Sequence, residues 1–171
     1  YLAELYGTPE GEIQPGEGIR DALTRISVNV YKDRLGLDVT SMPQSELLDG
    51  TQYFVFPNFL IWPSLANPLV YRFRPGEDPD SAIWETMIFL PFTGERPPSG
   101  PTKVLGTDDS LASVPELDLF GPILQQDAEN LALIQNGMKS SASQSLHLAR
   151  YQEARIRHYH DTLGKYVSGG I

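Results

Sequence analysis

One carboxylate in this sequence stands where its neighbours along a helix are apolar. Apolar residues recur at steps of four, three, four and three, and Asp127 takes the middle position. A carboxylate on an apolar face is costly unless it is paired, hydrogen-bonded or bound to a metal. The spacing predicts either a structural contact, such as a salt bridge or loop cap, or a metal ligand. The stripe consists of Phe120, Leu124, Asp127, Leu131 and Ile134.

The C-terminal segment places further ionisable residues in an apolar seam. Residues 146–167 have helical spacing, and the seam includes Glu153 and His160. His160 is a candidate ligand, but a single histidine on an apolar face more often belongs to a core, and His158 lies off the seam. Glu153 and Arg157 have the spacing of a helical ion pair. No histidine has a partner at HExxH-type spacing, so the ligand set within this chain is incomplete.

Composition excludes several other kinds of site. The 171 residues include no cysteine, which excludes disulfides, a thiol nucleophile, Cys-ligated zinc and a self-contained iron–sulfur cluster. The GxSxG, Walker and GxGxxG motifs are absent. The pair Asp108-Asp109 is interpreted as solvated loop residues rather than an acid/base pair. A net charge of −9 argues against nucleic acid or an anionic membrane as partner.

The sequence has no targeting or membrane signal. Its N-terminus lacks the basic and apolar regions of a signal peptide, and its longest apolar stretch, residues 53–62, is too short to cross a bilayer. We therefore expect a cytoplasmic protein. The chain opens without methionine, so it is either a fragment or a trimmed product.

Strands are expected in the first half of the chain. Residues 1–17, rich in Gly and Pro, predict a flexible lead-in. Residues 19–35 have the period of an amphipathic helix, although residues 27–31 also alternate like a strand. A short helix over Ser45–Asp49, closed by Gly50, leads to an antiparallel meander and then a loop over residues 93–107. The expected strands are Tyr53–Phe56, Phe59–Trp62, Pro68–Phe73 and Ser81–Phe92.

Helices are expected in the second half. Ser113 and Glu116 match a capping box, and Pro122 marks a helix start. This helix is expected to stop at Gly137 in a left-handed cap. A final helix is expected over Gln144–Val167. Strands followed by helices predict an α+β fold in which a curved antiparallel sheet packs against a long C-terminal helix.

Two blocks carry a family resemblance. YFVFPNFLIW (Tyr53–Trp62) leads to PLVYRFRPGEDPDSAIWETMIFLPF (Pro68–Phe92), and FGPILQQDAENLALIQNGMKS (Phe120–Ser140) precedes YQEARIRHYHDTLGKYV (Tyr151–Val167). In this order, over residues 45–167, they resemble the catalytic domain of the α subunit of Rieske non-haem iron ring-hydroxylating oxygenases. That family has a strand ending in Phe-Pro-Asn, an Arg-Pro turn, an Asp shortly before Gln-x-Gly, and a closing helix.

The resemblance implies a fold and a set of site residues. It implies the helix-grip (START-like) α+β fold, incomplete here, with residues 1–171 forming the C-terminal part of the catalytic domain. Asp127 would be the carboxylate of the facial triad that holds Fe(II). Asn58, Phe120 and Leu124 would be substrate-binding candidates, for which core packing or turn formation is an equally good interpretation.

The resemblance also implies an activity for the parent enzyme. That enzyme would add O2 to an aromatic substrate, using NADH-derived electrons that reach mononuclear Fe(II) from a ferredoxin or reductase through a [2Fe–2S] Rieske cluster. It would form an α homotrimer, with or without β subunits. The Rieske ligands and the two-histidine motif are missing from this sequence. We therefore expect the isolated chain to bind iron poorly and to be inactive.

Two other classes of protein remain open. A non-catalytic START-like module that binds an apolar ligand would explain the missing histidines without a longer parent. A structural subunit like the family's β partner fits less well, because the block around Asp127 belongs to the α-subunit pattern. The sequence upstream of Tyr1 would separate these alternatives.

Overall fold

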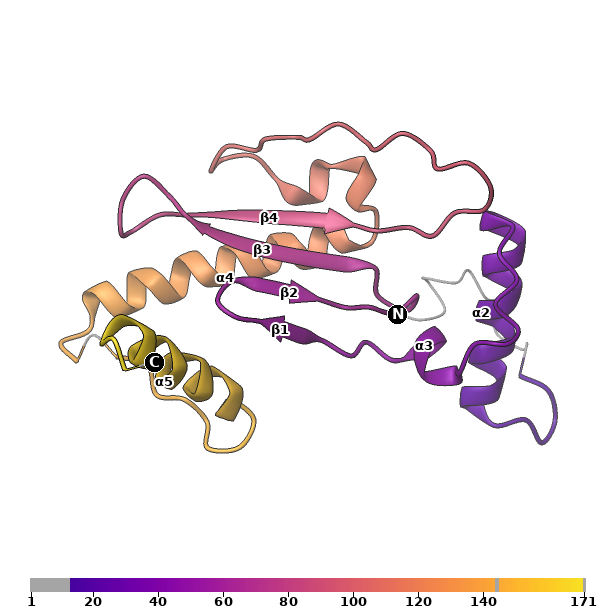
Figure 1. Cartoon of the computed structure of the whole chain (residues 1–171), viewed down its shortest axis with the longest axis horizontal. Helices are drawn as coiled ribbons and strands as arrows, with labels where there is room; N and C mark the ends of the chain where they lie inside the picture. Colours follow the sequence, from indigo (N-terminus) through magenta and orange to yellow (C-terminus); the bar gives the residue numbers. More distant parts are fainter. Residues whose placement is uncertain (1–12, 144, 171) are drawn as a thin grey trace. The chain divides into compact units, whose positions relative to one another are not determined.

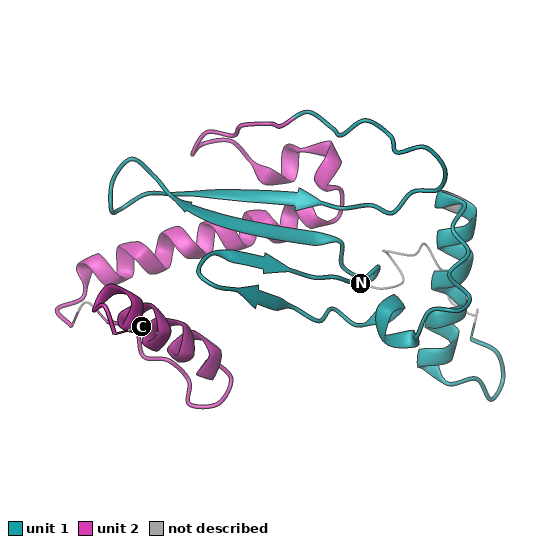
Figure 2. Ribbon diagram, viewed as in Figure 1, with its two compact units in different colours: residues 1–101 teal, residues 102–171 magenta. Residues whose placement is uncertain are grey.

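The computed structural model describes residues 13–143 and 145–170. The chain divides into two compact units, residues 1–101 and residues 102–171 (Figure 2). The fold is α+β, with an open four-stranded antiparallel sheet and helices (Figure 1), which is consistent with part of a helix-grip catalytic domain. Of the expected lead-in, residues 1–12 lie outside the described part of the chain.

The first unit contains the sheet. Its strands follow the order β1-β2-β3-β4, so the expected antiparallel meander is confirmed. The last strand is shorter than expected and ends at Ile88, because β3 begins at Leu69 and pairs with it there. The strands are β1 (Tyr53–Val55), β2 (Phe59–Ile61), β3 (Leu69–Pro75) and β4 (Ala82–Ile88).

One face of the sheet carries a cluster of aromatic rings. The Tyr71 ring meets Trp62 edge-on at a centroid distance of 4.9 Å and Trp84 at 5.3 Å. Phe73, which is paired with Trp84 in the register, stacks on that ring at 5.7 Å. Each such ring pair contributes about 0.5–1.5 kcal/mol beyond the area it buries. The aromatic cluster therefore fixes the register of β3 against β4.

The opposite face carries charge, as strand alternation requires. Arg72 and Arg74 on β3 both bind the Glu85 carboxylate on β4, Arg74 through Nη2 at 2.8 Å. These two hydrogen-bonded guanidinium groups lower the pKa of Glu85. The aromatic rings and the ion pairs thus lie on opposite faces of the sheet.

Two helices of the described chain, α2 and α3, precede the sheet. The helix α2 (Ile19–Leu35) has the bounds that its spacing predicts, which excludes the strand alternative for residues 27–31. Ala22 and Ile26 are buried on its inner side. Gly36 ends the helix at φ 64°, a conformation that favours glycine. The short helix α3 (Gln44–Leu48) follows, and its Leu47 is fully buried.

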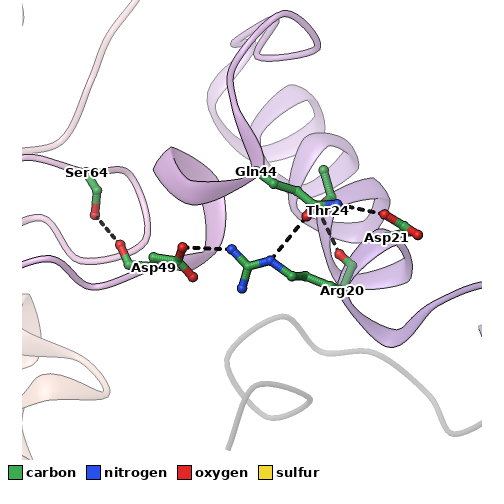
Figure 3. A network of polar contacts seen from close by, with 6 residues as sticks. All are labelled: Arg20, Asp21, Thr24, Gln44, Asp49 and Ser64. Carbon is green, nitrogen blue, oxygen red and sulfur yellow. Dashed lines mark hydrogen bonds and ion pairs between the residues drawn. The ribbon is translucent and has the colours of Figure 1, made fainter.

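A polar network joins α2 to α3 and to the chain after β2 (Figure 3). Arg20 donates from Nη2 to Asp49 Oδ2 at 2.7 Å and from Nε to Gln44 Oε1 at 3.1 Å. Gln44 donates in turn to Asp21 Oδ1 at 2.8 Å, and Ser64 Oγ donates to the Asp49 carbonyl at 3.1 Å. The hydrogen bond from Arg20 lowers the pKa of Asp49.

The second unit is helical. Two short 3-10 turns, η1 (Leu111–Ser113) and η2 (Pro115–Leu117), lead to α4 (Phe120–Ser140), and α5 (Ala154–Val167) follows. Leu117 of η2 and Leu124 of α4 are buried, and Leu124 has no exposed surface. No helix among the described residues is long and apolar enough to cross a bilayer.

The expected capping box before α4 is wrong. Ser113 ends η1, and its hydroxyl donates to the Ser110 carbonyl at 2.6 Å instead of capping a helix. The Glu116 carboxylate binds Lys103 at 2.6 Å, and this hydrogen bond lowers the pKa of Glu116. Both side chains have other partners, so two 3-10 turns form where one capped helix start was expected. Pro122 does lie in the first turn of α4.

The expected end of α4 at Gly137 is also wrong. The helix continues to Ser140, and Gly137 does not have a positive φ. The Ser140 hydroxyl donates to the Asn136 carbonyl at 2.8 Å, and the Ser141 N–H donates to the Gly137 carbonyl at 3.0 Å. These bonds carry the helix past the glycine, although a glycine inside a helix costs about 1 kcal/mol relative to alanine.

The last helix begins later than expected. α5 starts at Ala154, with Glu153 as its N-cap residue, although its end at Val167 is confirmed. Glu153 accepts the Ala149 N–H, and Arg157 donates to the Ala149 carbonyl at 2.7 Å and to the Arg150 carbonyl. Both side chains bind backbone groups of the preceding turns rather than each other. These hydrogen bonds of Glu153 and Arg157 to the backbone replace the expected ion pair, and the helix begins at Ala154.

Candidate functional site

Asp127 lies on α4 and is exposed. Its helical stripe exists, but only Leu124 in it is fully buried, while Leu131 and Ile134 are 50% and 47% exposed. In the described part of the chain, the Asp127 carboxylate makes no hydrogen bond or ion pair. The expected salt bridge or loop cap therefore has no partner there. Its role as a metal ligand stays a prediction.

The N-terminal half of α4 is held against η1 by Gln125. Its Oε1 accepts the Leu111 N–H at 2.8 Å and the Ser110 hydroxyl at 3.3 Å. Its Nε2 donates to Glu129 Oε1 at 2.8 Å. Sequence reasoning missed Gln125, because an isolated glutamine at a helical position carries no signal for such a contact.

The role of the three substrate-binding candidates stays a prediction. In the first unit, Asn58 Nδ2 donates to the Phe73 carbonyl at 2.6 Å, and the Phe73 N–H donates back to the Asn58 carbonyl at 3.0 Å. In the second unit, Phe120 is the first residue of α4 and is half-buried, while Leu124 is fully buried. Asn58 thus joins the turn between β1 and β2 to β3, and Leu124 packs in the core of its unit.

The histidines of α5 are exposed. His158 and His160 both face solvent, and the His160 ring meets Tyr159 edge-on at 5.3 Å. Within residues 13–143 and 145–170, no group of three or more His, Cys, Asp or Glu side chains could hold a metal ion. The loop residue Asp109 accepts the Gly106 N–H at 2.7 Å, which is a turn contact.

The donor chemistry of Asp127 fits one ligand of a non-haem iron site. A carboxylate oxygen is one of the three ligands in a two-histidine, one-carboxylate site, and the Asp127 carboxylate is exposed and uses neither oxygen in a described bond. The described residues do not supply the other two ligands. Asp127 thus fits as part of such a set.

The first unit has an open, mostly apolar depression of about 370 Å³. It lies where the loop after β2 meets α3 and the segment after β4. Its wall is held by backbone bonds from the Leu65 N–H to the Glu46 carbonyl at 3.1 Å and from the Trp62 N–H to the Leu69 carbonyl at 3.1 Å. The lining includes Met42, Glu46, Trp62, Leu65, Val70 and Leu90, but none of the three substrate-binding candidates.

The chain matches one family model. Residues 17–169 match the model of the ring hydroxylating alpha subunit (catalytic domain). No curated protein and no solved structure matches the chain. The matched residues include the whole sheet, α4 with Asp127, and α5.

Proposed function

This chain belongs to the family of ring-hydroxylating α-subunit catalytic domains, and we propose that it supplies the carboxylate ligand of the mononuclear iron in such an enzyme through Asp127. The family indicates that the parent is a ring-hydroxylating oxygenase, in which non-haem iron and a Rieske cluster are expected. Iron, when bound, activates O2 for addition to the aromatic ring.

The observation that carries this proposal is the free carboxylate of Asp127. Most acidic groups in the neighbouring elements are engaged, as Glu116 is by Lys103 and Glu129 is by Gln125. The Asp127 carboxylate is exposed and has no partner among the described residues. A side chain held on a helix but left without a protein partner is available to a ligand from outside the described chain.

The other parts of the enzyme come from outside this sequence in our proposal. Two histidine ligands complete the iron site, and a Rieske cluster with two cysteine ligands passes on NADH-derived electrons from a ferredoxin or reductase. The assembly is an α homotrimer with or without β subunits. A single carboxylate cannot retain Fe(II) against water, so the isolated chain is proposed to be inactive.

The substrate of the proposed enzyme is an aromatic small molecule. Phe120 is half-buried, so it is a better candidate for direct contact with an aromatic ring than the fully buried Leu124. Asn58 stays a candidate through the part of its side chain that does not bind the Phe73 carbonyl.

An anaerobic iron-retention assay tests the proposal. The isolated 171-residue chain is mixed with one equivalent of Fe(II), desalted and assayed for bound metal. We expect far less than one iron per chain, because one carboxylate is present. Stoichiometric, tightly held iron would refute the claim that two ligands lie elsewhere. The natural reading frame upstream of Tyr1 is the second check, and we expect it to encode Cys/His pairs and a two-histidine motif.

A further inference from the structure

We propose that Gln125 is the positioning residue that sets the orientation of Asp127. The proposal rests on the proposed function, because it concerns the carboxylate that we assign to iron. Gln125 lies on α4, two residues before Asp127. Its side chain accepts a hydrogen bond from the backbone of η1. Its side chain therefore determines how the helix segment that carries Asp127 is held.

The first turns of α4 are the packed part of that helix. Gly121 and Leu124 are buried, whereas every residue from Glu129 to Gly137 is exposed. Leu124 supplies apolar packing without a direction, because burial is not directional. The hydrogen bond from the Leu111 N–H to Gln125 Oε1 does have a direction, and its 2.8 Å length is well within the normal range. Gln125, together with the packing of Gly121 and Leu124, thus restrains the rotation of the helix about its own axis.

Gly121 lets the backbone of η1 approach α4 closely. A Cβ atom added at Gly121 would lie 3.0 Å from the Leu111 carbonyl oxygen and 3.1 Å from the Ala112 Cα. Any other residue would push η1 away from α4. Both backbone groups of Leu111 therefore contact α4: its carbonyl lies close to Gly121, and its N–H donates to the Gln125 amide oxygen.

The distance from this tether to Asp127 is short. Two residues of α-helix advance about 3 Å along the axis, so a movement of the α4 backbone at Gln125 also moves the backbone at Asp127. Side chains extend about 5–6 Å from a helix axis, and a rotation of about 10° would move the carboxylate by about 1 Å. Displacements of this size separate a working ligand geometry from a poor one.

The test compares matched glutamine variants. Gln125→Leu keeps the size of the side chain and removes the acceptor, whereas Gln125→Glu keeps an oxygen for the Leu111 N–H. Gln126→Leu is the control, because Gln126 is exposed and adjacent, and its side chain makes no hydrogen bond with the described residues. In the 171-residue chain, hydrogen exchange of the Leu111 amide reports the tether directly. We expect Gln125→Leu alone to accelerate that exchange.

The iron-site readout uses the polypeptide encoded by the complete natural reading frame. Its ferrous site is treated with nitric oxide, and the electron paramagnetic resonance spectrum reports the symmetry of the ligand field. We expect Gln125→Leu to shift that spectrum and to weaken iron binding about tenfold, as for other residues that orient a ligand. Gln125→Glu combined with Glu129→Gln, which keeps a hydrogen bond between the two side chains, retains most of both, and Gln126→Leu changes neither.

Each outcome decides a different claim. If Asp127→Asn changes the nitrosyl spectrum but Gln125→Leu does not, the positioning role is refuted and the proposed function stands. If Asp127→Asn leaves iron content and spectrum unchanged, the proposed function fails and the positioning role fails with it. An unprotected Leu111 amide in the unmodified chain would overturn the tether itself.

Discussion

Replacing Gly137 with alanine should stabilise the protein. Gly137 lies inside α4, has no positive φ, and has no atom within 4 Å of the position that a Cβ would take. Alanine is favoured over glycine inside a helix by about 0.5–1 kcal/mol. With a urea dependence of about 1 kcal/mol per molar for a small protein, the unfolding midpoint should rise by about 0.5–1 M.

The matched variant in the same helix should have the opposite effect. Gly121→Ala places its Cβ 3.0 Å from the Leu111 carbonyl oxygen, where the backbone would have to shift. Such overpacking costs about 1–3 kcal/mol, which exceeds the gain in helix propensity. The midpoint of urea unfolding should therefore fall.

The assay is far-UV circular dichroism at 222 nm through a urea titration, with the unmodified chain and both variants measured side by side. A lower midpoint for Gly137→Ala would mean that Gly137 takes a left-handed conformation and that α4 ends there. An unchanged midpoint for Gly121→Ala would mean that η1 does not press against α4.

Three further predictions concern other parts of the chain. Leu124→Ala should lower the free energy of unfolding by about 2–5 kcal/mol, whereas Leu133→Ala, at a site 67% exposed, should change it by less than about 0.5 kcal/mol in the same titration. The hydrogen bond from Arg25 lowers the pKa of Glu17 from 4.5 to about 2. The stabilising effect of the Glu17–Arg25 pair is therefore present above pH 4.5 and is lost as the pH falls toward 2. The difference in urea midpoint between Glu17→Gln and the unmodified chain should shrink over that range. Arg20→Met should lower the midpoint at low salt, and the loss should be smaller in 1 M NaCl, because the pair that Arg20 forms with Asp49 is exposed.

Regular periodicity predicted the elements that depend on local sequence. The steps of three and four between Ile19, Leu23, Ile26 and Val30 predicted α2, and the turn residues between the strands predicted the meander. The family resemblance was confirmed by the match to residues 17–169. These features could be predicted because each depends on residues that are close in sequence.

Contacts between residues farther apart in sequence could not be predicted. The start of α5 depends on Arg157 reaching back to the Ala149 carbonyl, and the loss of the capping box depends on Lys103 binding Glu116. The stripe that contains Asp127 suggested a buried carboxylate, yet Asp127 is exposed, since periodicity gives the face of a helix but not what covers it. The contact of Gln125 was not predicted either, because its partner Leu111 lies fourteen residues away in the sequence.

The central claim is that Asp127 is an iron ligand. The iron content of the polypeptide encoded by the complete natural reading frame tests it most directly. We expect about three irons per chain, two in the [2Fe–2S] cluster and one at the mononuclear site. In Asp127→Ala the total should fall to about two, while the visible absorption of the cluster is retained. Asp161→Ala, at an exposed aspartate on α5, is the control and should keep all three. Three irons in Asp127→Ala would contradict the assignment of Asp127 as the ligand.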